Sequence, residues 1–164
     1  MSNMLEDVLE TAEDTQKGKY LIFTIGKEEY GIEIRYVTEI VGIQAITVVP
    51  ELDSYIKGVI NLRGKIIPVM DVRIRFKKEE RAYDDRTCII VVEIGDISVG
   101  LIVDRVSEVL SIPEDQIVPP PEINKGAKNR YINAIGKTGK DVKLLIDCRK
   151  LLNDNDIDAI NEIV

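Results

Sequence analysis

The stretch YIKGVINLRGKIIPVMDVRIRF, residues 55–76, contains the feature around which the rest of the chain repeats. Two apolar segments, Ile56–Ile60 and Ile66–Met70, flank the polar turn Asn61-Leu62-Arg63-Gly64. Apolar β-branched runs separated by a short glycine-containing turn predict a β-hairpin, with the arginine at its tip and the glycine at positive φ. Pro68 has no N–H for a strand ladder, so we expect the second strand at a barrel edge or at a bulge.

A large part of the chain is repeated around this hairpin. A shift of 69 positions lays residues 20–50 on residues 89–119 without a gap. The identical pairs are Ile25/Ile94, Gly26/Gly95, Gly31/Gly100, Val37/Val106, Glu39/Glu108, Ile43/Ile112, Val49/Val118 and Pro50/Pro119. A shift of 76 positions then lays Tyr55 on Tyr131. The match indicates an internal duplication, although alternating β sequences also resemble one another without a common origin.

The repeat predicts a mainly β fold made of two small barrels of about five strands each. Neither barrel would bury much core alone, so we expect the barrels to share an apolar face. The approximate halves are residues 18–78 and 87–152, and an exchange of strands between them is left open. Short helices are expected at the termini. Residues 1–17 form an acidic lead, expected to be a flexible tail, and residues 153–164 carry a helical apolar stripe that packs on a barrel or binds a partner helix.

The second copy differs from the first at the hairpin tip. Its turn reads Lys137-Thr138-Gly139-Lys140, so only the first copy has the Asn-Leu-Arg-Gly turn. Arg63 is either an ordinary turn arginine or a side chain that a partner captures, as arginines at interfaces often are. The sequence leaves both interpretations open.

Composition excludes several classes of function. The 164 residues carry a formal net charge of −7 and no histidine. A nucleic-acid partner would need a basic face, which such an acidic chain is not expected to have. No apolar run approaches the roughly 18 residues of a membrane span. Cys88 and Cys148 make no metal pair or disulfide framework by themselves, and we expect them to be reduced core thiols in a cytosolic protein.

The sequence contains near-matches to catalytic motifs, but the required residues do not stand at the required spacing. Residues 58–65 and 131–138 approach a phosphate-binding loop, but required positions are wrong in each. Without histidine, a Ser–His or Cys–His pair cannot form, and no carboxylate set has metal-binding spacing. The chain is therefore predicted to be a binding module without enzymatic activity, cofactor or metal. The alternative is a small-molecule-binding barrel or an enzyme with a pocket between the copies.

The aligned segments Val37–Ile40 and Val106–Val109 are candidates for a partner site. Equivalent strands would line a groove between the barrels, and alternate apolar residues there would suit an elongated partner such as a helical hairpin. Glu39 and Arg63 would then fix the partner's register by charge. The simpler interpretation of the two valines is plain core.

Three passages resemble the CheW family of bacterial chemotaxis coupling proteins. They are YLIFTIGKEEYGIEIRYVTEIVGI (20–43), the hairpin stretch at 55–76, and VGLIVDRVSEVLSIPEDQIVPPPE (99–122). The resemblance spans about residues 18–152 and includes the specific core Gly-Val-x-Asn-Leu-Arg-Gly-x-x-x-Pro-Val-x-Asp, which also occurs in the histidine kinase CheA and in CheV. It implies two five-stranded SH3-like barrels, no enzymatic activity, and an adaptor that joins transmembrane chemoreceptors to CheA.

The resemblance also implies binding residues and partners. In the family, positions in or near receptor binding match Val37, Glu39, Gly100 and Val106. Positions of the central motif needed for coupling match Gly58, Asn61, Arg63 and Gly64. The implied partners are the CheW-like regulatory domain of CheA and the cytoplasmic tip of chemoreceptors, with no nucleic acid and no direct membrane insertion. We expect a cytoplasmic monomer that receptor arrays recruit to the inner face of the membrane. The acidic lead and the loop at 120–130 depart from the family pattern.

Overall fold

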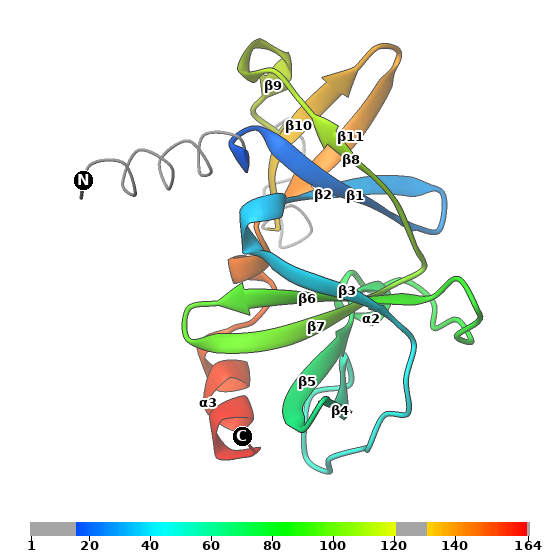
Figure 1. The fold of residues 1–164 in the computed structure, drawn as a ribbon, viewed down its shortest axis with the longest axis vertical. Coiled ribbons are helices and arrows are strands. Elements are labelled where there is room, and N and C mark those ends of the chain that lie inside the picture. Colours follow the sequence, from blue (N-terminus) through cyan, green and yellow to red (C-terminus); the bar gives the residue numbers. More distant parts are fainter. Residues whose placement is uncertain (1–15, 121–130, 164) are drawn as a thin grey trace, which may run out of the picture.

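The computed structural model describes residues 16–120 and 131–163 (Figure 1). Its strands are β1 (Lys19–Ile25), β2 (Glu28–Glu33), β3 (Val37–Gly42), β4 (Ile56–Leu62), β5 (Lys65–Asp71), β6 (Cys88–Ile94), β7 (Ile97–Val103), β8 (Arg105–Ser111), β9 (Ile117–Val118), β10 (Ile132–Thr138) and β11 (Asp141–Ile146). The helices are α2 (Val72–Arg75), α3 (Asp154–Ile163) and the 3-10 turns η1 (Ile34–Tyr36), η2 (Glu114–Gln116) and η4 (Cys148–Lys150). Most of the acidic lead and the loop at 121–130 lie outside the described residues.

The strands form two sheets, which confirms the predicted mainly β fold. One sheet has five strands in the order β3-β6-β7-β5-β4, and the other has six in the order β8-β1-β2-β11-β10-β9. The sixth strand is the two-residue β9, which pairs with Ile135 and Gly136 of β10. The prediction of five strands in each barrel missed β9, because two residues are too few to show an alternating pattern.

Each sheet combines strands from both halves of the chain (Figure 1). β8 of the second half pairs with β1 of the first half, and β3 of the first half pairs with β6 of the second. The strand exchange that the sequence left open is therefore present. The halves 18–78 and 87–152 are units of sequence, and neither builds a complete sheet by itself.

The register of the two sheets repeats the sequence alignment. A pair of cross-strand neighbours in one sheet is aligned, by the sequence repeat, with a pair of cross-strand neighbours in the other sheet. These pairs are Ile22–Glu108 and Val91–Glu39 in the antiparallel ladders, and Gly31–Leu145 and Gly100–Val69 in the parallel ladders. The aligned glycines and the aligned glutamates therefore occupy equivalent places, as a duplication predicts.

The hairpin at 55–76 forms as predicted, but Pro68 does not lie at an edge. β5 lies inside its sheet, between β7 and β4. Opposite Pro68, Val59 exchanges both of its backbone hydrogen bonds with Thr47 on its other side, at 2.9 Å each. The parallel ladder with β7 begins only at Val69. No ladder hydrogen bond is needed from the nitrogen of residue 68, so a proline fits inside the sheet.

The two sheets share one large core, as expected for barrels too small to bury one alone. Its buried side chains come from both halves and include Leu21, Phe23, Ile32, Ile90, Val92, Leu101 and Val103. A smaller cluster that contains Ile60, Val69 and Ile89 draws on strands of the five-stranded sheet. Helix α3 packs on the large core through Ile160, so its apolar stripe serves the fold.

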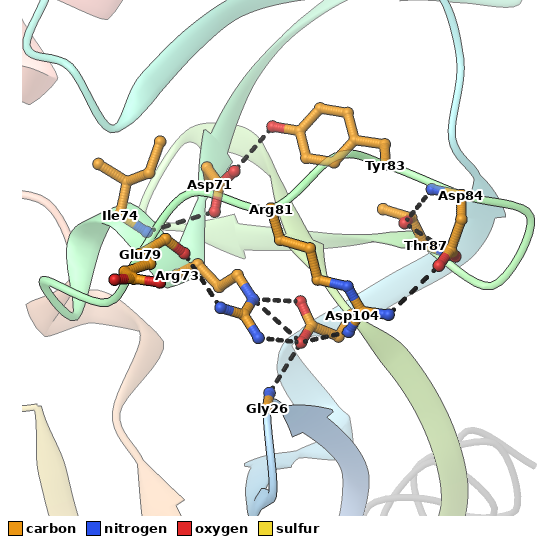
Figure 2. A network of polar contacts seen from close by, with 10 residues as sticks. All are labelled: Gly26, Asp71, Arg73, Ile74, Glu79, Arg81, Tyr83, Asp84, Thr87 and Asp104. Carbon is orange, nitrogen blue, oxygen red and sulfur yellow. Dashed lines mark hydrogen bonds and ion pairs between the residues drawn. The ribbon is translucent and has the colours of Figure 1, made fainter.

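The crossing from β7 to β8 is fixed by the carboxylate of Asp104 (Figure 2). Arg73 of α2 donates to it from Nε at 2.8 and 3.0 Å and from Nη2 at 2.9 Å. The N–H of Gly26, in the β1–β2 turn, donates to the same carboxylate at 2.7 Å. Arg81, from the segment between the halves, lies 3.4 Å away. One carboxylate therefore joins both sheets and the linking segment.

We expect Asp104→Asn to lower the free energy of unfolding by about 1 to 3 kcal/mol at neutral pH, because it removes the counter-charge of the largely buried Arg73 guanidinium. Burial alone would raise the pKa of Asp104, but the hydrogen bonds from Arg73 and Gly26 lower it below its usual value. The ionised carboxylate therefore stabilises the fold fully above its unfolded pKa of about 4, and this contribution is lost as the pH falls towards the lower folded value.

Chemical denaturation at a series of pH values measures this effect. The difference between wild type and Asp104→Asn should shrink below about pH 4. Asp85→Asn, which changes an exposed carboxylate in the same linking segment, is the control and should leave stability nearly unchanged. Equal stability of Asp104→Asn and wild type at pH 7 would contradict the role given to this carboxylate.

Candidate functional site

The tip of the first hairpin is a tight turn held by its own residues. Asn61 accepts a hydrogen bond at Oδ1 from the N–H of Gly64 at 2.8 Å. Arg63 and Gly64 both have positive φ, 53° and 87°, whereas the sequence predicts this only for the glycine. Asn61 and Gly64 thus shape the tip. Arg63 is the residue that the tip presents, with 69% of its side chain exposed.

Arg63 forms an ion pair with Glu39 of β3. β3 and β4 are the two end strands of the five-stranded sheet, so the pair links the two ends of that sheet. An exposed ion pair adds only about 0 to 1 kcal/mol to stability, which leaves this pair available for other roles. From the sequence, we expect each of the two charges to contact a partner, and the structure shows that they contact each other. The second copy lacks the pair, because Gly139 is aligned with Arg63 and has no side chain to reach Glu108.

β3 and β8, which follow the links between the two sheets, are edge strands and present equivalent side chains. Val37 and Val106 are half-buried and pack against the large core, which gives weight to the core interpretation of these valines. Ile40 and Val109 are aligned as well and are 42% and 51% exposed. Sequence reasoning did not single out Ile40 and Val109. The alternation along β3 was the available signal, since it puts Ile40 on the face opposite to Glu39.

Gly58 and Gly100 lie inside the protein and offer no side chain to a partner. Gly58 has a φ of 146°, and a Cβ there would lie 2.0 Å from the carbonyl oxygen of Thr47. A Cβ on Gly100 would lie 2.7 Å from Ile89 and 2.9 Å from Val69. Both glycines allow close packing of neighbouring backbone or side chains. A part in binding would therefore be indirect for both.

We expect Gly58→Ala and Gly100→Ala each to lower the free energy of unfolding by about 1 to 3 kcal/mol, because the added methyl group overpacks both places and Gly58 is also strained. Gly42→Ala in β3 is the matched control, since no atom lies within 4 Å of a Cβ there. Its effect should stay within about 0.5 kcal/mol. Denaturant titration checks all three, and equal behaviour of the three would reject the packing argument.

Metal-binding capacity, thiol reactivity and pocket size can be assessed in the described residues. Among them, no group of three or more Cys, Asp or Glu side chains could hold a metal ion. Burial raises the pKa of the Cys148 thiol to about 12, so the thiol stays protonated and inert at neutral pH. The pocket beside Asp104 has a volume of about 10 Å³, roughly the space of one water molecule. No helix in residues 16–120 or 131–163 is long and apolar enough to span a bilayer.

Comparison with known proteins identifies the family. A family model described as a CheW-like domain matches residues 19–156. The chemotaxis protein CheW of Klebsiella aerogenes is 38% identical over 159 residues, which cover 97% of this chain and 96% of that protein. The chemotaxis protein CheW of Bacillus subtilis is 36% identical over 143 residues, which cover 87% of this chain and 92% of that protein.

A solved structure agrees with these matches. The crystal structure of the scaffolding protein TtCheW from Thermoanaerobacter tengcongensis has a TM-score of 0.78 and 39% sequence identity. The similarity covers 85% of this chain and 94% of that chain. The resemblance carried by the three sequence passages is thus confirmed, and the chain belongs to the CheW-like family of chemotaxis adaptor proteins.

Proposed function

We propose that the protein couples transmembrane chemoreceptors to the histidine kinase CheA, as a non-enzymatic adaptor in the cytoplasm that receptor arrays recruit to the membrane. The observation that supports this most is the pair of equivalent edge strands, β3 and β8. β3 and β8 carry the aligned, exposed Ile40 and Val109, and β3 is joined to the hairpin tip by the Arg63–Glu39 ion pair.

The receptor tip is proposed to lie along β3 and β8. Exposed apolar side chains on two equivalent strands suit an elongated partner such as a helical hairpin, which buries one apolar face along its length. Val37, Glu39 and Val106 are proposed to position these strands for the receptor, because the two valines pack on the large core and Glu39 lies on the face opposite to Ile40. Individual contacts of exposed apolar side chains are weak, and repetition in an array would supply avidity.

The regulatory domain of CheA is proposed to bind a barrel face near the hairpin tip. Arg63 belongs to the tip and Glu39 to β3, so a partner at the tip and a partner on β3 would act on one ion pair. When two ligands act on one contact, each changes the affinity for the other by the same factor. Coupling would then be a linkage between two binding events, without a chemical step.

Titrations with isolated partners test this proposal. The chain, as a monomer, should bind a receptor cytoplasmic fragment and, separately, the regulatory domain of CheA. Its addition to receptors and CheA should place kinase activity under receptor control. A metabolite screen should give no saturable binding. Binding of a metabolite, together with no binding of either protein, would overturn the proposal in favour of a small-molecule-binding barrel.

We expect Arg63→Glu to lower receptor-coupled kinase activity by about tenfold or more, because the reversal adds a like charge as well as removing a bond. Its melting temperature should stay close to that of wild type, since exposed ion pairs contribute little to folding. Lys140→Glu, in the aligned turn of the second hairpin, makes the same charge change and should be much milder. Thermal unfolding and kinase assays in reconstituted arrays give both readings, and equal activity of the two variants would reject the asymmetric tip.

The charge-swapped variant Arg63→Glu with Glu39→Arg separates two roles of the arginine. It rebuilds an ion pair of opposite direction between the tip and β3. If the link between tip and strand matters, as we expect, the double variant should regain most of the coupling that Arg63→Glu loses. Failure of the swap, in a protein that still folds, would mean that the Arg63 guanidinium itself contacts a partner.

A further inference from the structure

The crossing from β2 to β3 corresponds to the crossing that Asp104 fixes, but its charges differ. Under the shift of 76 positions Arg149 is aligned with Arg73, and under the shift of 69 positions Arg35 is aligned with Asp104. The second crossing therefore has an arginine, Arg149, in the place of Arg73, but it has no carboxylate in the place of Asp104. A second arginine stands where the carboxylate would be.

Among the described residues, both arginines pair with carboxylates close in sequence. Arg149 donates from Nε and Nη2 to Asp147 at 2.9 Å each, and 57% of its side chain stays exposed. Arg35 donates from Nε to Glu33 and is 61% exposed. The guanidinium carbon of Arg149 lies 5.5 Å from the ring centroid of Tyr36, and that of Arg35 lies 4.8 Å from it. Two cations thus lie close to one ring at the surface, in a chain of net charge −7.

Donors and space remain at this cluster. In the described part of the chain, Nη1 of Arg149 and both Nη groups of Arg35 have no hydrogen-bond partner. The turns η1 and η4 that carry these arginines both contact β6. Gly95 follows the end of β6, and no atom of the described residues lies within 4 Å of a Cβ built on it. On the aligned Gly26, by contrast, such a Cβ would lie 3.5 Å from the Arg73 side chain. No side chain in that part of the protein therefore packs on Gly95 as Arg73 packs on the aligned Gly26.

Electrostatics favours an anion between the two arginines. The exposed Arg35–Glu33 pair is worth only about 0 to 1 kcal/mol, so Arg35 can turn to a better partner at little cost. Arg149 keeps its bidentate pair with Asp147, whose side chain is only 9% exposed, and offers its unused Nη1 to the same partner. A carboxylate that bridges two guanidinium groups accepts charge-assisted hydrogen bonds from both and reduces their mutual repulsion. The first crossing shows the product of this chemistry, since Asp104 accepts from Arg73 and lies close to Arg81 (Figure 2).

We infer that Arg35 and Arg149, held over Tyr36, bind the carboxylate of an acidic side chain on the chemoreceptor tip. The inference rests on the proposed function, because η1 leads directly into β3, the strand along which the receptor is proposed to lie. The receptor's carboxylate fixes the second crossing from outside, as Asp104 fixes the first from within. Receptor binding is thereby connected to β3, the edge strand that carries Glu39.

Charge reversal at the cluster tests the inference. Arg149→Glu and Arg35→Glu should each raise the Kd for a receptor cytoplasmic fragment about tenfold or more, and the loss should be largest at low salt. Arg86→Glu is the matched control, because it reverses another exposed arginine that lies away from the cluster. Its neighbour Thr87 accepts a backbone hydrogen bond from Ile43, which follows the far end of β3. The Kd of this variant should stay within about twofold of wild type. Thermal unfolding shows whether each variant is folded. If a charge-reversed variant is unfolded, Arg149→Gln or Arg35→Gln takes its place in the binding assay.

Rescue identifies the receptor residue. In a series of single acid-to-Lys changes in the receptor fragment, one change should restore binding to Arg149→Glu. If the wild-type chain binds no receptor fragment, the proposed function fails and this inference fails with it. If wild type binds and both arginine variants bind within about twofold of it, or if Arg86→Glu weakens binding equally, only the inference is overturned.

Discussion

Each sheet of this protein contains a hairpin from the other half of the chain. The β1–β2 hairpin lies between β8 and β11, and the β6–β7 hairpin lies between β3 and β5, so the links from β2 to β3 and from β7 to β8 must pass from one sheet to the other. The exchange makes one cooperative unit of two barrels that are too small to be stable alone, because their apolar faces form a common core. It also leaves β3 and β8 at sheet edges, where side chains such as Ile40 remain accessible.

The duplication separates residues that serve the fold from residues that serve a partner. Gly31 and Gly100 are retained in both copies because a Cβ at either place would collide with core side chains. The charged positions differ: Asp104 closes one crossing, while the aligned Arg35 leaves the other open. The Arg73–Asp104 pair is largely buried, whereas Arg35 and Arg149 are exposed. The first crossing is thus closed within the fold, and the charges of the second remain accessible to a partner.

Alternation and repeat length were enough to predict the β class, the shared core and the equivalence of the two copies, since these depend on the local period of apolar residues. Features set by neighbours in space were not predictable in this way. Pro68 lies inside a sheet because Val59 bonds elsewhere, and β9 exists only because β10 offers it an edge. The ion pair between Arg63 and Glu39 depends likewise on which strands end the sheet.

The centre of the molecule shows that not every difference between the copies concerns a partner. The buried guanidinium of Arg75 lies 4.6 Å from the rings of both Tyr55 and Tyr131, which are aligned residues. Its Nε donates at 2.6 Å to the carbonyl oxygen of Leu151, the residue aligned with Arg75 itself. A residue that touches its own counterpart lies close to the symmetry axis, where two buried arginines would repel and lack room. Burial disfavours a second cation beside the first, so the fold itself accounts for this difference between the copies without a partner.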